Sequence, residues 1–151
     1  MERTSKLKNK KLILLRDILL AAFVSFVAAS ISHTQFVLYE LSNIGVEIDL
    51  ATRLSASLHD LIGFLPAFLP VIILGLTIGF GVTAWIISRF NLKQNGWYLL
   101  AGGVSLLMIH TLMHPILEIT LIAGARSFSG LMMQAVAGII GGWLFYLLRK
   151  A

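Results

Sequence analysis

The residues best suited to do chemistry in this chain are His110, His114 and Glu118, which follow one another at intervals of four. On a helix, four residues advance a side chain by about 6 Å and turn it by only about 40°, so the group would form a ladder about 12 Å long. Imidazoles at this spacing can share a divalent ion such as Zn²⁺, with a carboxylate as a further ligand. Imidazole also titrates near neutral pH, so the same ladder could carry protons. The pattern predicts a metal site or a proton site and does not choose between them.

Further polar residues are expected at the same level as this ladder. In the metal interpretation, His59 or Asp60 would complete the coordination shell. In a purely structural interpretation, Glu118 would form an ion pair and each histidine would donate to a neighbouring helix or to water. The side chains available for such a network, or for contact with a partner, are His33, Arg126 and Gln134. Arg126 would pair with Glu118, and the amide of Gln134 is expected at a depth where it could meet His110 or His114.

Catalysis has less support from the sequence than binding or assembly. No strained Gly-x-Ser-x-Gly turn and no fixed third member of a triad marks a serine nucleophile. A metal-dependent hydrolase would more often carry His-Glu-x-x-His, whereas Thr111 follows His110. We therefore name no catalytic residue and expect a protein that is not an enzyme.

Four long apolar stretches must position these polar groups. Each has the ~20 residues that a helix needs to cross a bilayer. They cover residues 12–32, 64–88, 97–122 and 128–148. The composition agrees, with 58% hydrophobic residues, 13% charged residues and a mean hydropathy of +0.89. The expected fold is an all-α bundle of four transmembrane helices, which forms one domain over residues 12–151 after a basic tail at residues 1–11.

The distribution of basic residues predicts the orientation of this bundle. Lysines and arginines gather before the first stretch, between the second and third, and after the fourth. The positive-inside rule then places both termini in the cytoplasm, with a bacterial cytoplasmic membrane as the expected location. The formal charge of +5 is better explained by anionic lipid headgroups than by nucleic acid, because the cations lie at membrane boundaries. Cleavage of the first stretch as a signal peptide is the alternative at the N-terminus.

The loop at residues 33–63 is the longest polar segment, and an amphipathic interfacial helix is expected within it. Asp49 is suited to cap the start of this helix. Its apolar line would consist of Leu50, Leu54, Leu58 and Leu61. We expect it to end at Gly63 and Pro66, and the second span to bend where Pro66 and Pro70 stand four residues apart.

Two glycine pairs indicate close helix packing. Gly75 with Gly79 and Gly138 with Gly142 both have the GxxxG spacing, which lets two helix backbones approach each other. The contact could lie within one chain or between copies in a homo-oligomer or larger membrane complex. The chain has no cysteine, so disulfides and thiolate ligands are excluded.

Two functional hypotheses follow from these features. The first is a non-catalytic assembly or accessory module of the membrane. The second is an ion- or metal-handling protein that uses His110, His114 and Glu118, with His59 and Asp60 from the loop. An intramembrane enzyme is a third and weaker alternative.

Overall fold

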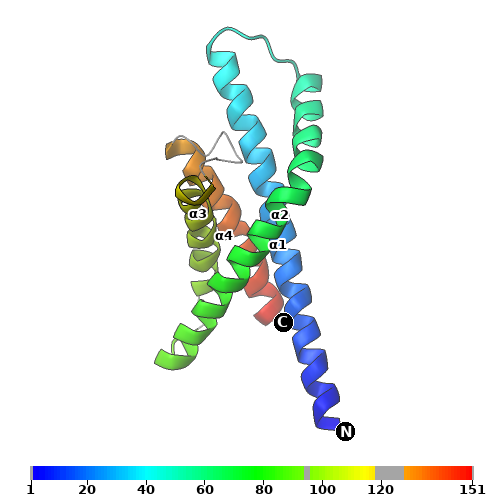
Figure 1. Ribbon diagram of the computed structural model, residues 1–151, viewed down its shortest axis with the longest axis vertical. Coiled ribbons are helices and arrows are strands. Elements are labelled where there is room, and N and C mark those ends of the chain that lie inside the picture. The colour runs from blue at the N-terminus through cyan, green and yellow to red at the C-terminus, as the bar shows by residue number, and fades with distance from the viewer. Residues whose placement is uncertain (1, 94–95, 118–127, 151) are drawn as a thin grey trace.

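In the part of the chain that the computed structural model describes, four helices form a bundle (Figure 1). The structure describes residues 2–93, 96–117 and 128–150, and for residues 2–8 and 113–117 the backbone alone. The helices are α1 (Glu2–Asn43), α2 (Leu50–Phe90), α3 (Trp97–Leu117) and α4 (Phe128–Lys150). Within these ranges there is no β-strand. The all-α class agrees with the prediction, whereas the loop helix that was expected in addition to the four spans is part of α2.

Three of the helices, α1, α2 and α4, are long and apolar enough to cross a membrane. The described side chains of α3 form a shorter apolar helix, Trp97–Leu112. The end of the third predicted stretch, residues 118–122, lies outside the described residues. Residues 2–11, which belong to the predicted basic tail, are the first turns of α1.

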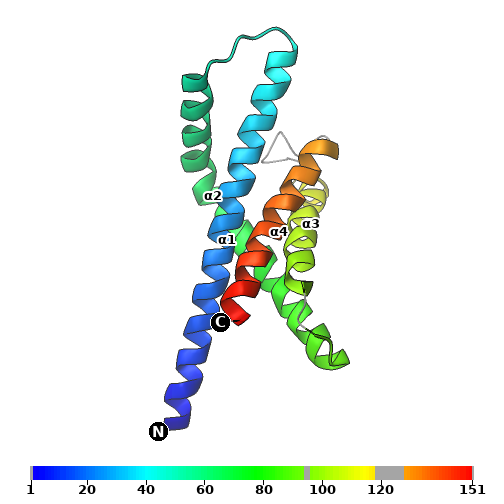
Figure 2. The same cartoon turned by 180° about the vertical axis from the view of Figure 1, so that it is seen from behind.

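The helices form a closed ring in which each packs against two neighbours. Helix α1 packs against α2 and α4, and α3 packs against the same two helices from the other side. Helices α1 and α2 have 42 and 41 residues, about 60 Å each at 1.5 Å per residue. Figures 1 and 2 show that their connection projects beyond α3 and α4, while both chain termini lie at the opposite end. We call these two ends the hairpin end and the terminal end.

Local capping sets the boundaries between α1, α2 and α3. Asp49 is the N-cap of α2, as predicted, and its carboxylate accepts a hydrogen bond of 2.8 Å from the amide of Thr52. After α1, Gly45 has a φ of 92°, a left-handed conformation that glycine adopts without a steric penalty. Asn91 caps the end of α2 with a φ of 50°.

The predicted end of the loop helix at Gly63 and Pro66 is wrong. Helix α2 is continuous from Leu50 to Phe90, with Pro66 and Pro70 inside it. Each proline removes one backbone hydrogen bond, but apolar contacts on both sides of the prolines keep the chain helical. The axis of α2 changes direction along its length (Figure 1), and the two prolines lie near its middle.

The core consists of apolar side chains from all four helices. Phe26, Phe68, Ile72, Leu76 and Leu106 are fully buried. Nearer the terminal end, the rings of Phe80 and Phe145 stack with their centroids 4.3 Å apart, and the ring of Tyr98 packs edge-on against both. This second set is called the aromatic layer below.

The glycine pairs face neighbouring helices of the same chain. A Cβ on Gly138 would collide with the carbonyl of Gly102, and one on Gly142 with the carbonyl of Tyr98, so the backbones of α3 and α4 touch. A Cβ on Gly75 would lie 2.6 Å from the Ile109 side chain of α3. Both pairs therefore have a packing partner inside the monomer.

Candidate functional site

A cluster of polar side chains is buried between the helices on the hairpin side of the aromatic layer. It contains His33 and Thr34 from α1, His110 from α3 and Gln134 from α4, none of them more than 6% exposed. Burying polar groups costs free energy unless they find partners. Their placement in the interior is therefore the feature of this fold that most needs an explanation.

His110 occupies the centre of this cluster. Its ring lies 5.5 Å from the ring of Phe68 on α2, and its imidazole faces the Gln134 amide and interacts with His33. The Nε2 atom of His110 has no hydrogen-bond partner among the described groups. A buried imidazole nitrogen without a partner is rare in folded proteins.

Gln134 ties α4 to α1. Its Nε2 donates a hydrogen bond of 3.1 Å to the backbone carbonyl of Ala29. Its Oε1 is buried and finds no donor among the described residues. Ser30, one residue further along α1, likewise buries an Oγ without a described partner. The cluster therefore contains more hydrogen-bonding atoms than it pairs.

Asp60 connects the cluster to the hairpin end. The Thr34 hydroxyl donates to its Oδ2 at 2.8 Å, and its carboxylate acts electrostatically on His33, whose ring also packs edge-on against Phe64. Asp60 is only partly buried. Of the buried groups, Thr34 is thus hydrogen-bonded to a carboxylate that solvent can reach, and His33 is within the electrostatic influence of the same carboxylate.

The predicted ladder is only partly within the described residues. The backbone of His114 continues α3, but its side chain, like Glu118 and Arg126, lies outside the described residues. His59 is exposed on α2, whereas Asp60 points to Thr34. In the described part of the chain, no three histidine or acidic side chains gather closely enough to hold a metal ion.

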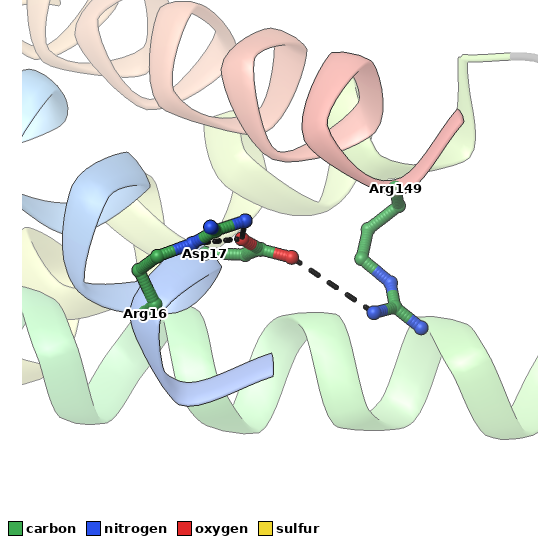
Figure 3. Close-up of polar contacts among 3 residues, drawn as sticks. All are labelled: Arg16, Asp17 and Arg149. Atoms are coloured by element: carbon green, nitrogen blue, oxygen red, sulfur yellow. Dashed lines mark hydrogen bonds and ion pairs between the residues drawn. The ribbon is translucent and has the colours of Figure 1, made fainter. Parts of the chain in front are cut away.

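The sequence analysis missed Asp17, which is the most deeply buried charged residue described. Its side chain is 0% exposed near the terminal end, between two arginines that are 60% and 42% exposed (Figure 3). Arg16 donates to Oδ1 from Nε at 3.1 Å and from Nη2 at 2.8 Å. Arg149 of α4 brings Nη1 to 3.9 Å from Oδ2. An acidic residue inside an apolar stretch was the available signal, because such residues turn toward the protein interior.

No protein-family model matches this chain, and no significant match was found among curated proteins or solved structures. The functional assignment must therefore come from what the described side chains can do. Two carboxylates, Asp60 and Asp17, stand near opposite ends of the bundle, and the buried histidines lie nearer to Asp60 along the helices. The aromatic layer separates the histidines from the terminal end.

Proposed function

We propose that this chain is a multi-pass membrane protein that binds and releases protons at His110. The cations of the terminal end support an orientation with both termini in the cytoplasm, by the positive-inside rule. They include Lys10, Lys11, Arg16, Arg89, Lys93, Arg149 and Lys150. The hairpin end then faces the opposite side of a membrane, the cytoplasmic membrane if the protein is bacterial.

The observation that carries this proposal is the pair of unpartnered atoms, Nε2 of His110 and Oε1 of Gln134. A carbonyl oxygen is only an acceptor, and a neutral imidazole carries one proton on its two nitrogens. When Nε2 is without a proton, these two atoms of facing side chains are both acceptors and cannot satisfy each other. One added proton turns Nε2 into a donor, and Oε1 can then accept a hydrogen bond from it. From the neutral tautomer that carries its proton on Nδ1, the site thus gains a hydrogen bond on protonation.

Proton access is supported from the hairpin end only. Asp60 is hydrogen-bonded to Thr34 at this end and acts electrostatically on His33, which acts electrostatically on His110. Toward the terminal end, the packed rings of Phe80, Tyr98 and Phe145 offer one titratable group, the phenol of Tyr98, which keeps its proton at neutral pH. This arrangement suits a proton-binding step coupled to a change in packing better than an open proton channel.

The test combines titration with flux. Proteoliposomes with a pH-sensitive dye would report proton movement, and ¹⁵N-histidine spectra would report titration of His110. We expect His110→Gln and Gln134→Leu each to abolish the proton movement that the dye reports. Met108→Leu is the matched control, because Met108 lies on α3 half a turn away and is 49% exposed. Unchanged flux and unchanged histidine titration in His110→Gln would reject the proposal.

A role in assembly is the second candidate, supported by an apolar row on the projecting part of α2. Leu50, Leu54, Leu58 and Ile62 are between 60% and 71% exposed. They precede the apolar stretch that would cross the bilayer, so lipid tails would not cover them. Exposed apolar surface of this kind commonly marks an interaction site.

Self-assembly through this row can be measured directly. The mass of the purified protein in detergent should correspond to a defined oligomer, and Leu54→Glu with Leu58→Glu should convert it to a monomer. Ala51→Glu with Ser55→Glu places the same two charges, also four residues apart, on exposed positions of α2 and should leave the mass unchanged. A monomer in the wild-type protein would remove self-assembly from consideration.

A further inference from the structure

An open apolar groove runs between α2 and α3, away from the polar cluster. Its volume is about 790 Å³, within the ~300–1,000 Å³ typical of small-molecule sites. Its walls include Leu74, Ile78 and Val82 from α2 and Val104, Met108 and Leu112 from α3. All six side chains are between 45% and 63% exposed. The groove therefore opens to the outside of the bundle, where a membrane would place acyl chains.

The glycines of α2 form the floor of this groove. Gly75 and Gly79 both line it and lie against the Ile109 and Ser105 side chains of α3. Because neither glycine has a side chain, the space above the contact stays hollow while the helices still touch.

Charged and amphipathic side chains continue the groove toward the terminal end. Arg89 lies seven residues after Val82 on α2, and Trp97 lies seven residues before Val104 on α3. Seven residues are nearly two helical turns, so each lies on the same helix face as its groove residue. Both are exposed, and Arg89 makes no ion pair with a described residue. A cation and a tryptophan at the end of an apolar groove match the headgroup level of a bilayer.

We propose that this groove binds an anionic phospholipid, with one acyl chain between α2 and α3 and the phosphate at Arg89. The proposal rests on membrane insertion in the orientation given above, which puts Arg89 at the cytoplasmic leaflet. The groove follows α2 from Val71 to Thr83 and ends about 9 Å along the helix before Arg89, and its own length is about 18 Å at 1.5 Å per residue. A helix about 10 Å across would need about 1,400 Å³ over that length, so an acyl chain fits the space better than a second copy.

Trp97 provides a local reporter of the lipid in this groove. Trp85→Phe with Trp143→Phe leaves Trp97 as the single tryptophan, and acyl chains carrying bromine quench its fluorescence on contact. Two bilayers of the same mixture of phosphatidylcholine and phosphatidylglycerol are compared, one with brominated phosphatidylcholine and the other with brominated phosphatidylglycerol. We expect Trp97 to favour brominated phosphatidylglycerol by about fivefold over its bulk fraction, as for one basic residue at a membrane surface.

Two variants test the headgroup contact and the groove separately. Arg89→Gln should remove the preference for the anionic lipid. The control is Lys11→Gln, which removes an exposed cation of α1 at the terminal end and should leave the preference unchanged. Val104→Phe should fill the groove and lower quenching by either lipid. Val136→Phe, at a position on α4 with a similar exposure of 50%, should not.

Three results would overturn the proposal. The first is equal quenching of Trp97 by both brominated lipids in the wild-type protein, and the second is a preference for phosphatidylglycerol that remains in Arg89→Gln. The third is protection of Trp97 from quenching by both lipids that increases with protein density, because it would identify a second copy as the occupant. His110→Gln should leave the lipid preference intact. The lipid site and the proton-binding site can therefore fail independently.

Discussion

Removing both guanidinium groups beside Asp17 should destabilise the protein far more than removing the charge of Asp17 itself. The Asp17 side chain is 0% exposed, and a buried carboxylate left without a counter-charge typically costs about 3–5 kcal/mol. The arginines are partly exposed, so each can turn to water or headgroups if Asp17 becomes neutral. The asymmetry in burial therefore predicts an asymmetry in the free energy of unfolding.

The single variants should differ because the two arginines contact Asp17 differently. Arg16 makes two hydrogen bonds to Oδ1, and after allowance for its exposure Arg16→Gln should cost about 1–2 kcal/mol. Arg149 makes no hydrogen bond at 3.9 Å, so Arg149→Gln should cost less than about 1 kcal/mol. The double variant should cost about 3–5 kcal/mol, more than the sum, because only then is the carboxylate unpaired.

The decisive comparison is with Asp17→Asn, which keeps the shape of the side chain and removes its charge. The charges that remain belong to Arg16 and Arg149, which are exposed enough for water or headgroups to solvate them, so we expect a cost below about 1.5 kcal/mol. Unfolding in mixed micelles, followed by circular dichroism over a titration with denaturing detergent, gives the free energy of each variant. An Asp17→Asn variant as unstable as the double arginine variant would refute the reasoning.

Two further predictions test the packing and the capping of the helices. Gly138→Ala should destabilise the bundle by about 1–3 kcal/mol, because its Cβ would meet the backbone of Gly102; Gly81→Ala, where a Cβ meets nothing within 4 Å, should stabilise it by about 0.5–1 kcal/mol. Equal effects at the two glycines in the same unfolding assay would contradict this packing. The hydrogen bonds from Thr52 hold the pKa of Asp49 below its ordinary value, so the cap stabilises α2 above the ordinary carboxyl pKa and is lost as the pH falls through the lowered value. Amide exchange at Thr52, corrected for its intrinsic pH dependence, should lose protection at low pH in the wild-type protein, and Asp49→Asn should make protection independent of pH over this range; an unchanged wild-type profile would argue against the cap.

The sequence by itself determined the helices and their local signals. Apolar length alone predicts helices close to the observed α3 and α4, and it predicts the apolar parts of α1 and α2, because a stretch of this kind satisfies its backbone only as a helix. The cap at Asp49 was also predictable, since an N-cap depends on one side chain and the next few amides. The expected proximity of Gln134 and His110 follows from their similar depths in neighbouring helices.

Tertiary structure decided which face of each helix is buried and which helices meet. Helix α3 is apolar on nearly all sides, so its sequence could not show that His110 turns to Gln134 or that Gly102 meets Gly138. The continuity of α2 through Pro66 and Pro70 depends on packing on both sides of the prolines, which a local rule cannot include. Asp17 is buried only because α4 returns at the terminal end and brings Arg149 beside it. In each case the deciding energy comes from residues far apart in the chain, and the fold alone brings them together.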